Sequence, residues 1–276
     1  MLPKKPGTII ESLLHNGLSL IAIRGAILTS SAVVTILLVR YLGAEGFGSY
    51  AAASSIYAVF LPFALFGLGN VITREVAKKT ALAWEYFSTA LCVGLGLTAV
   101  STAAIILFSL YAGYPEAVSQ AALVLAIGLY PNFIIQISES LFIGLEKVRY
   151  FALANAIAEA AEIALMVFFL THGYKLFAVV AALVAVRFCF ATALVFLVIR
   201  LTGKRRLVFD ARFAIRFLKV SSVFAAAGIL AGLLFKIDVL FLSRLAGLGA
   251  TGIYSAAYKV VNLWAMVLTS FIGVFY

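Results

Sequence analysis

The stretch Leu18–Leu42, LSLIAIRGAILTSSAVVTILLVRYL, has 25 residues, and only Arg24 and Arg40 among them are charged. A helix needs about 20 apolar residues to cross the hydrocarbon core of a bilayer. The apolar core of a signal peptide is shorter, at about 7–15 residues. The stretch therefore predicts a first membrane span that is retained in the protein.

The composition of the whole chain agrees with that prediction. Of 276 residues, 64% are hydrophobic and 12% are charged, and the mean hydropathy is +1.13. A soluble domain is nearer half apolar and a quarter charged. These values exclude a soluble enzyme, a nucleic-acid-binding domain and a disordered chain, and they predict a lipid bilayer as the surroundings.

Hydropathy and helix-breaking residues predict eight spans, with ends defined to within several residues. The predicted spans are 16–42, 49–72, 87–112, 117–144, 151–172, 176–200, 215–246 and 253–276. Lipid offers no hydrogen-bond partners to the backbone, and the runs are too long and too evenly apolar for barrel strands. The predicted fold is an all-α polytopic membrane helical bundle.

Basic residues predict the orientation of the bundle. Fourteen of the 21 Lys and Arg residues fall on the side that holds the N-terminus, and three fall on the other side. Cytoplasmic loops carry the excess of basic residues, so we predict a cytoplasmic N-terminus. The segment 201–219 mixes basic residues with phenylalanines and is expected to lie partly along the inner membrane surface.

The predicted outer loops are very short: 43–48, 113–116, 173–175 and 247–252. A membrane glycosyltransferase or polymerase usually needs a larger loop with acidic catalytic residues. We therefore predict no enzyme and no catalytic residues.

The first and last hairpins resemble one another. Leu38–Ala53 and Leu242–Ala257 align without a gap at an offset of 204 residues, and eight identities fall within 32 positions from residue 38 to 69. Gly43 aligns with Gly247 and Gly48 with Gly252. Chance similarity of two apolar helices is the alternative. The offset spans six helices, which favours a parallel repeat about an axis along the membrane normal.

The repeat predicts a domain division. Residues 1–210 form a six-helix transmembrane lobe, and residues 211–276 form the first hairpin of a second, pseudo-symmetric lobe. Tyr276 falls within a predicted span, so we expect the chain to be a fragment of a longer protein.

Neither a cofactor nor a metal is predicted. Gly247–Gly252 matches the pattern G-x-G-x-x-G, but a dinucleotide fingerprint joins a strand to a helix, and this segment joins two spans. Cys92 and Cys189 lie in apolar runs, and His15 and His172 do not form a metal site alone.

Ionisable residues inside the predicted spans need a reason, because a charge at mid-bilayer costs about 2.5–3.5 kcal/mol on insertion scales. Glu162 and Arg187 lie at one depth of an antiparallel hairpin. Asn155, Glu159 and Glu162 share one helix face. A structural Glu162–Arg187 salt bridge is one interpretation, and a proton or ion relay is the other.

A second polar stripe, Asn132, Gln136 and Glu139, lies beside Pro131. These residues are three and four positions apart and share a face that must contact protein or a water-filled cavity. Cavity lining and interhelical hydrogen bonding are equally compatible with this pattern.

The third group lies in the last hairpin. Lys236 and Lys259 are roughly level, Asp238 points to a different side from Lys236, and Asn262 shares a face with Lys259. One interpretation is a packing network or snorkelling to the outer interface, and the other is an anion site in a central cavity. Arg24 lies near the inner end of the first span, and two interpretations fit it equally well: a side chain that snorkels to the interface, or a cation in the cavity.

Four segments carry a resemblance to a known family. They are Arg40–Ala51 (RYLGAEGFGSYA), Phe66–Ala77 (FGLGNVITREVA), Lys236–Leu242 (KIDVLFL) and Gly252–Lys259 (GIYSAAYK). The sequence resembles the bacterial polysaccharide-biosynthesis and oligosaccharide flippases of the multidrug/oligosaccharidyl-lipid/polysaccharide exporter superfamily. The resemblance covers essentially the whole chain.

The resemblance implies two lobes around a central cavity in a bacterial or archaeal cytoplasmic membrane. It implies alternating access that moves a polyprenyl-diphosphate-linked oligosaccharide from the inner to the outer leaflet. It also implies partners such as a glycan polymerase or other envelope-synthesis proteins. Basic cavity residues would hold the diphosphate, and Arg24, Lys236 and Lys259 are the candidates.

Coupling to an ion gradient would involve Asp238, Glu159 or Glu162. The rival functions are a cation-coupled multidrug antiporter of the same superfamily, a membrane-embedded enzyme of glycan synthesis and a non-transporting scaffold. A cation exporter favours acidic cavity groups, whereas the first, seventh and eighth spans favour basic ones.

Overall fold

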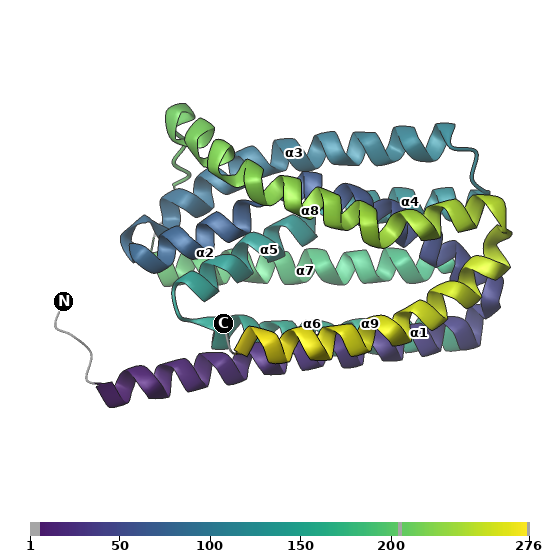
Figure 1. Ribbon diagram of the computed structural model, residues 1–276, viewed down its shortest axis with the longest axis horizontal. Coiled ribbons are helices and arrows are strands. Elements are labelled where there is room, and N and C mark those ends of the chain that lie inside the picture. The colour runs from purple at the N-terminus through teal and green to yellow at the C-terminus, as the bar shows by residue number, and fades with distance from the viewer. Residues whose placement is uncertain (1–5, 204–205, 275–276) are drawn as a thin grey trace.

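The computed structural model describes residues 6–203 and 206–274, and of residues 6–24, 26–28, 260 and 262–274 it describes the backbone alone (Figure 1). Every regular element in the described residues is helical. The elements are α1 (Pro6–Leu65), α2 (Leu68–Lys78), η1 (Thr80–Leu82), α3 (Ala83–Tyr111), α4 (Glu116–Ile127), α5 (Leu129–Gly144), α6 (Val148–Thr171), α7 (Leu176–Thr202), α8 (Ala211–Leu245) and α9 (Gly247–Val274). The predicted all-α membrane bundle is confirmed.

Five helical segments of the described chain are long and apolar enough to cross a membrane, and a sixth is added if α4 and α5 count as one bent span. The first of these segments, Thr29–Leu65, contains Gly43, whose φ of 69° and ψ of −177° interrupt the helix. The chain reverses there, so α1 is a hairpin with two arms (Figure 1). This turn corresponds to the predicted boundary between the first two spans.

Two predicted spans are not single helices. The span predicted at 49–72 is broken after Leu65, where Phe66 and Gly67 have φ of 44° and 66°. The span predicted at 117–144 is divided at Gly128, where α4 and α5 meet at a bend of 41°. Pro131 has no N–H to donate to the carbonyl four residues earlier, which favours this bend.

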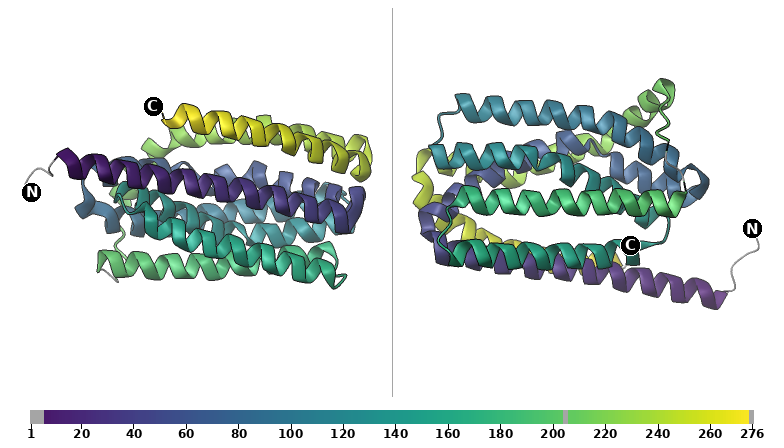
Figure 2. Two further views of the ribbon diagram at one scale, coloured as in Figure 1. Left: turned by 90° about the horizontal axis from the view of Figure 1, so that it is seen from below. Right: turned by 180° about the vertical axis from the view of Figure 1, so that it is seen from behind.

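The turns of the two hairpins, at the end of the bundle that the basic residues predict to be the outer end, meet in a symmetric backbone contact. A Cβ atom added at Gly48 would lie 1.8 Å from the Leu248 carbonyl oxygen, and one added at Gly252 would lie 2.0 Å from that of Ala44. Ala44 and Leu248 are themselves related by the 204-residue offset. Gly247 repeats the positive φ of Gly43, at 82° against 69°. Only glycine permits an approach this close, so α1 and α9 lie side by side here (Figure 2).

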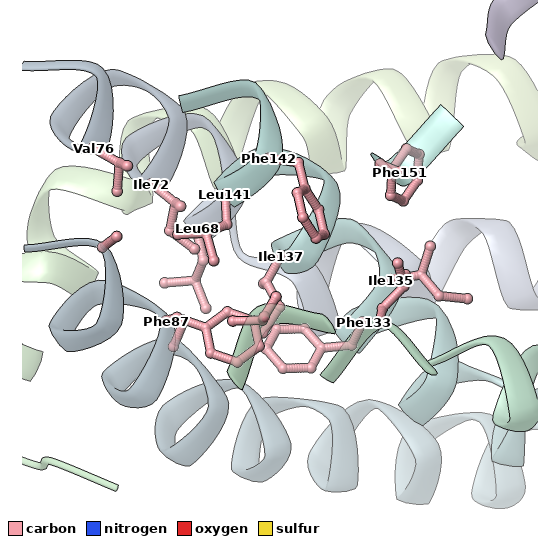
Figure 3. Packing of buried hydrophobic residues seen from close by; sticks show 14 of the residues in the cluster. Leu68, Ile72, Val76, Phe87, Phe133, Ile135, Ile137, Leu141, Phe142 and Phe151 are labelled. Carbon is pink, nitrogen blue, oxygen red and sulfur yellow. The ribbon is translucent and has the colours of Figure 1, made fainter. Parts of the chain in front are cut away.

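The largest apolar core lies at the opposite end of the bundle. Leu68 and Ile72 from α2, Phe87 from α3, and Phe133 and Leu141 from α5 are completely buried there (Figure 3). Side chains of α6, α7 and α8 also pack into this core. It fixes the positions of the helices that surround the sites described below.

The segment between α7 and α8 is fastened to α3. The Trp84 indole N–H donates to the Arg206 carbonyl at 2.8 Å, and the Ser88 hydroxyl is bonded to both the N–H and the carbonyl of Val208, at 2.6 and 2.8 Å. Asp210 caps the first turn of α8 by accepting from the Arg212 N–H. The position of 201–219 along the inner membrane surface stays a prediction.

Candidate functional site

A pocket lies between the two repeated hairpins, next to the glycine contact. Its empty space is about 450 Å³, which includes space that is open to the surroundings. It is lined by Phe47, Tyr50, Ala51, Ser54 and Ser55 of α1, Lys236 and Val239 of α8, and Ser255, Tyr258 and Lys259 of α9. The α1 residues are three and four positions apart and so form one helix face.

The pocket is lined by equivalent positions of the two repeated hairpins. Ala51 and Ser255 are equivalent at the 204-residue offset, as are Ser54 and Tyr258, and Ser55 and Lys259. The same face of both second arms therefore lines one cavity. The repeat keeps the helices but changes the chemistry, because a lysine in one hairpin stands where the other has a serine.

The electrostatics of the pocket are basic. Lys236 and Lys259 are half-buried there, and among the described residues no carboxylate belongs to the lining. Neither lysine forms an ion pair within the part of the chain that the structure describes. Hydroxyl groups of serine and tyrosine supply further donors. Charged donors in a partly desolvated cavity are suited to an anionic group such as a phosphate.

Asp238, which the sequence groups with these lysines, takes a different direction. Its carboxylate accepts from the Tyr254 hydroxyl at 2.5 Å and from the Val239 N–H at 2.8 Å, and it does not line the pocket. The i, i+2 spacing from Lys236 accounts for this. The structure therefore brings Lys236 and Lys259 to one cavity and leaves Asp238 beside it.

An acidic network lies across α1 from the pocket. The Arg187 guanidinium donates to Glu162 Oε2 at 2.9 Å and to Glu159 Oε1 at 3.4 Å, and a further contact joins Arg187 Nε to Glu162. Both carboxylates are buried. Two carboxylates face one guanidinium, so the formal charge of the network is −1. Asn155, buried on the same helix face, leaves its amide nitrogen without a hydrogen-bond partner in the described residues.

Two tyrosines of α1 contribute polar groups at or near the pocket. Tyr50 lines the basic pocket. Tyr57, two turns further along, accepts a hydrogen bond from the Asn132 side chain. The repeat pairs Tyr50 with Tyr254 but gives Tyr50 no place in a pocket, and Tyr57 is one more aromatic residue in an apolar span.

The other predicted residues lie elsewhere. Gln136 is exposed and Glu139 is half-buried on α5, and neither belongs to the pocket lining. Asn132, which is also outside the pocket lining, donates to the Tyr57 hydroxyl of α1. The side chains of Arg24 and Asn262 lie outside the described residues.

Arg244 joins the outer end of α8 to the loop between α3 and α4. Its guanidinium donates to the Gly113 carbonyl at 3.0 Å and stacks over the Tyr114 ring at 4.9 Å. The Tyr114 hydroxyl accepts from Ser243 at 3.4 Å. In the sequence Arg244 counts only as a basic residue of the outer side, although its equivalence to Arg40 in the repeat was a signal of a defined place in the hairpin.

Two kinds of comparison relate the chain to known proteins. The sequence model of a family described as "Polysaccharide biosynthesis protein" matches residues 13–276. No curated protein sequence matches the chain.

Solved structures share the fold. The MATE multidrug transporter DinF-BH has a TM-score of 0.71 and 16% identity, over 98% of this chain and 64% of its own. An inward-facing multidrug resistance MATE family transporter of the MOP superfamily has a TM-score of 0.63 and 18% sequence identity, over 90% of this chain and 61% of its own. A third structure is a MOP superfamily transporter from Pyrococcus furiosus, which is described as having a binding pocket of reverse polarity. It has a TM-score of 0.64 and 14% sequence identity, over 94% of this chain and 61% of its own. The chain thus spans less than two thirds of the length of these proteins.

Proposed function

The chain belongs to the polysaccharide biosynthesis protein family, and from that premise we propose that it moves a polyprenyl-diphosphate-linked oligosaccharide from the inner to the outer leaflet by alternating access. The product would supply cell-surface polysaccharide synthesis. The observation that carries the proposal is the pocket between the two hairpins, which holds Lys236 and Lys259 and, among the described residues, no carboxylate.

The physical problem defines what the protein has to supply. A glycan and a diphosphate cannot cross hydrocarbon unaided, whereas the polyprenyl tail can stay in lipid. Each lysine costs about 2.5–3.5 kcal/mol at mid-bilayer, a cost that binding a diphosphate offsets. No bond is made or broken, so the residues need only to bind the anion and release it on the other side.

Ion coupling is assigned to the acidic groups near the pocket. The Glu159–Glu162–Arg187 network carries one uncompensated negative charge, which a proton or a cation would neutralise. The network lies on α6 and α7, and α6 packs against α1, one wall of the pocket, so we expect a change of charge at Glu162 to influence an anion bound there. Asp238, through Tyr254, is the alternative coupling group.

A multidrug antiporter is the second candidate, because two of the similar structures are described as MATE multidrug transporters. The polarity of the pocket opposes it. An organic cation would meet two lysines and no compensating acid among the described lining residues. The Pyrococcus furiosus relative is described as having a pocket of reverse polarity that suggests a different function, so pocket charge varies within this fold.

The test uses the full-length protein in liposomes with a fluorescent polyprenyl-diphosphate sugar. Lys259→Ala should slow translocation about tenfold or more, because a charge-assisted hydrogen bond contributes roughly 1.5–3 kcal/mol. Lys259→Arg should retain most of the rate, and Lys175→Ala, in the loop before α7, should leave it unchanged. Uptake of an organic cation that is insensitive to Lys259 would support the antiporter instead. Release of free polyprenyl diphosphate would support an enzyme.

A further inference from the structure

A second pocket lies at the opposite end of the bundle from the glycine contact. It lies between α2, the start of α3 and the start of α8, and its empty space is about 700 Å³, which includes space that is open to the surroundings. These three segments lie together at one end of the molecule (Figure 1). The proposed translocation assigns no role to this pocket.

The wall of this pocket is aromatic. Tyr86 of α3 meets Phe213 and Phe217 of α8 edge to face, with ring centroids 4.9 and 5.4 Å apart and interplanar angles of 67° and 87°. Aromatic rings with one polar hydroxyl are typical of the level at which lipid headgroups meet hydrocarbon. Such a wall suits a ligand that has an apolar part.

The rim of the pocket is basic. Arg74 and Lys78 both bind Glu75, at 2.8 and 3.0 Å, and the Lys78 hydrogen bond is the largest cause of a lowered Glu75 pKa. Glu75 is therefore an anion that two cations share, and this group of three carries a net charge of +1. Arg216, on the other side of the pocket, forms no ion pair within residues 6–203 and 206–274.

The neighbouring segment indicates where this end of the molecule sits. Leu207 and Phe209 expose 62% and 57% of their surface although hydrogen bonds to Trp84 and Ser88 hold the segment against α3. Apolar side chains that are held outward beside basic ones are typical of a segment at the membrane interface. The distribution of basic residues predicts that this end lies at the cytoplasmic leaflet, where anionic lipids gather. Basic pockets between helices on that side bind the headgroups of such lipids.

We propose that the pocket between Arg74 and Arg216 binds the headgroup phosphate of an anionic phospholipid. The two guanidinium groups bind the phosphate from opposite sides, and the upper acyl chain lies along Tyr86, Phe213 and Phe217. The lipid would thus join α8, from the second hairpin, to α2 and α3 of the first lobe. The proposal is independent of what the protein transports.

The experiment titrates the purified full-length protein in detergent with phosphatidylglycerol and counts bound lipids by native mass spectrometry. Phosphatidylcholine with the same acyl chains is the zwitterionic control. Each basic group near a membrane surface contributes about 1 kcal/mol, so Arg74→Gln and Arg216→Gln should each weaken phosphatidylglycerol binding about fivefold, and the double variant about 30-fold. Glu75→Gln, which removes the carboxylate that competes for Arg74, should bind as tightly as the wild type or more tightly.

Arg212→Gln is the matched control, because it removes the same charge from α8 one turn before Arg216, outside the pocket lining. Equal losses in this control and in the Arg216 variant would mean general surface charge and would overturn the proposal. Equal binding of phosphatidylcholine would overturn it as well. Complete displacement by millimolar inorganic phosphate would show a site for free phosphate, and binding of polyprenyl diphosphate without phosphatidylglycerol would show a substrate site. Either result would also contradict the proposal.

Discussion

Substituting Gly48 by alanine should open the outer end of the molecule. The added Cβ would lie 1.8 Å from the Leu248 carbonyl oxygen, whereas ordinary van der Waals contact begins at 3.4 Å. The neighbour is backbone and cannot rotate away, so α1 and α9 must separate by about 1.6 Å, the difference between these two distances. Overpacking of this kind costs about 1–3 kcal/mol, which corresponds to about a 5- to 150-fold change in the ratio of closed to open outer ends.

The assay is double electron–electron resonance between spin labels at Tyr111 and Leu245, which are exposed at the outer ends of α3 and α8. The native Cys92 and Cys189 are replaced by alanine first, because both are exposed. We expect Gly48→Ala to shift the distance distribution toward a longer, separate population, and Gly252→Ala should do the same because it meets the Ala44 carbonyl.

The control is Gly249→Ala, in the first turn of α9, where an added Cβ has nothing within 4 Å. Its distance distribution should match that of the parent protein. The reasoning is refuted if Gly249→Ala opens the outer end as much as Gly48→Ala. It is equally refuted if Gly48→Ala leaves both the distance distribution and the melting temperature of the parent protein unchanged.

Three further predictions concern charged groups. Arg187→Ala should lower the free energy of unfolding by about 3–5 kcal/mol, because it leaves Glu162 buried without its partner. We expect this single variant to be expressed poorly and the Glu162→Arg/Arg187→Glu double variant to regain expression. Failure of the double variant to recover would argue against a structural pair. Arg244→Ala removes the hydrogen bond to the Gly113 carbonyl, which contributes about 1 kcal/mol to the closed outer end. The ratio of open to closed molecules in the same spin-label assay should therefore rise roughly fivefold. An unchanged ratio would mean that Arg244 does not hold the outer end closed. Cationic neighbours lower the pKa of Glu75, so its ionised form stabilises the fold at neutral pH, and this stabilisation is lost as the pH falls below 4.5. The difference in melting temperature between the wild type and Glu75→Gln should therefore shrink between pH 7 and pH 4. A constant difference would exclude this linkage.

The sequence predicts those features that depend on spacing along one element. Glu162 and Arg187 could be placed at one depth because both were counted from the same short loop, and the structure has them in contact. Gly43 and Gly247 could be recognised as turns because the repeat puts glycine where positive φ is needed. Membrane helices are also the strongest signal of all, since lipid imposes one rule on every backbone group.

Features that depend on packing between elements were not predictable. The close approach of α8 to Gly67, where an added Cβ would meet Phe224 at 2.5 Å, needs knowledge of which helix lies opposite. The pocket position of Tyr50 depends on where α9 crosses α1, and no periodicity reports that crossing. The same holds for Arg244, because its partner Gly113 lies 131 residues away along the chain.

The glycine contact links the histories of two distant positions. Each partner presents a glycine to a carbonyl four residues before the other glycine, so the surface is complementary to itself. A lobe that carries such a surface can pack against a second copy of itself, as the subunits of a two-fold homodimer do. Duplication of one gene therefore provides both halves of the joint at once. Two positions that are 204 residues apart then depend on each other, because neither glycine can acquire a side chain while the contact is kept.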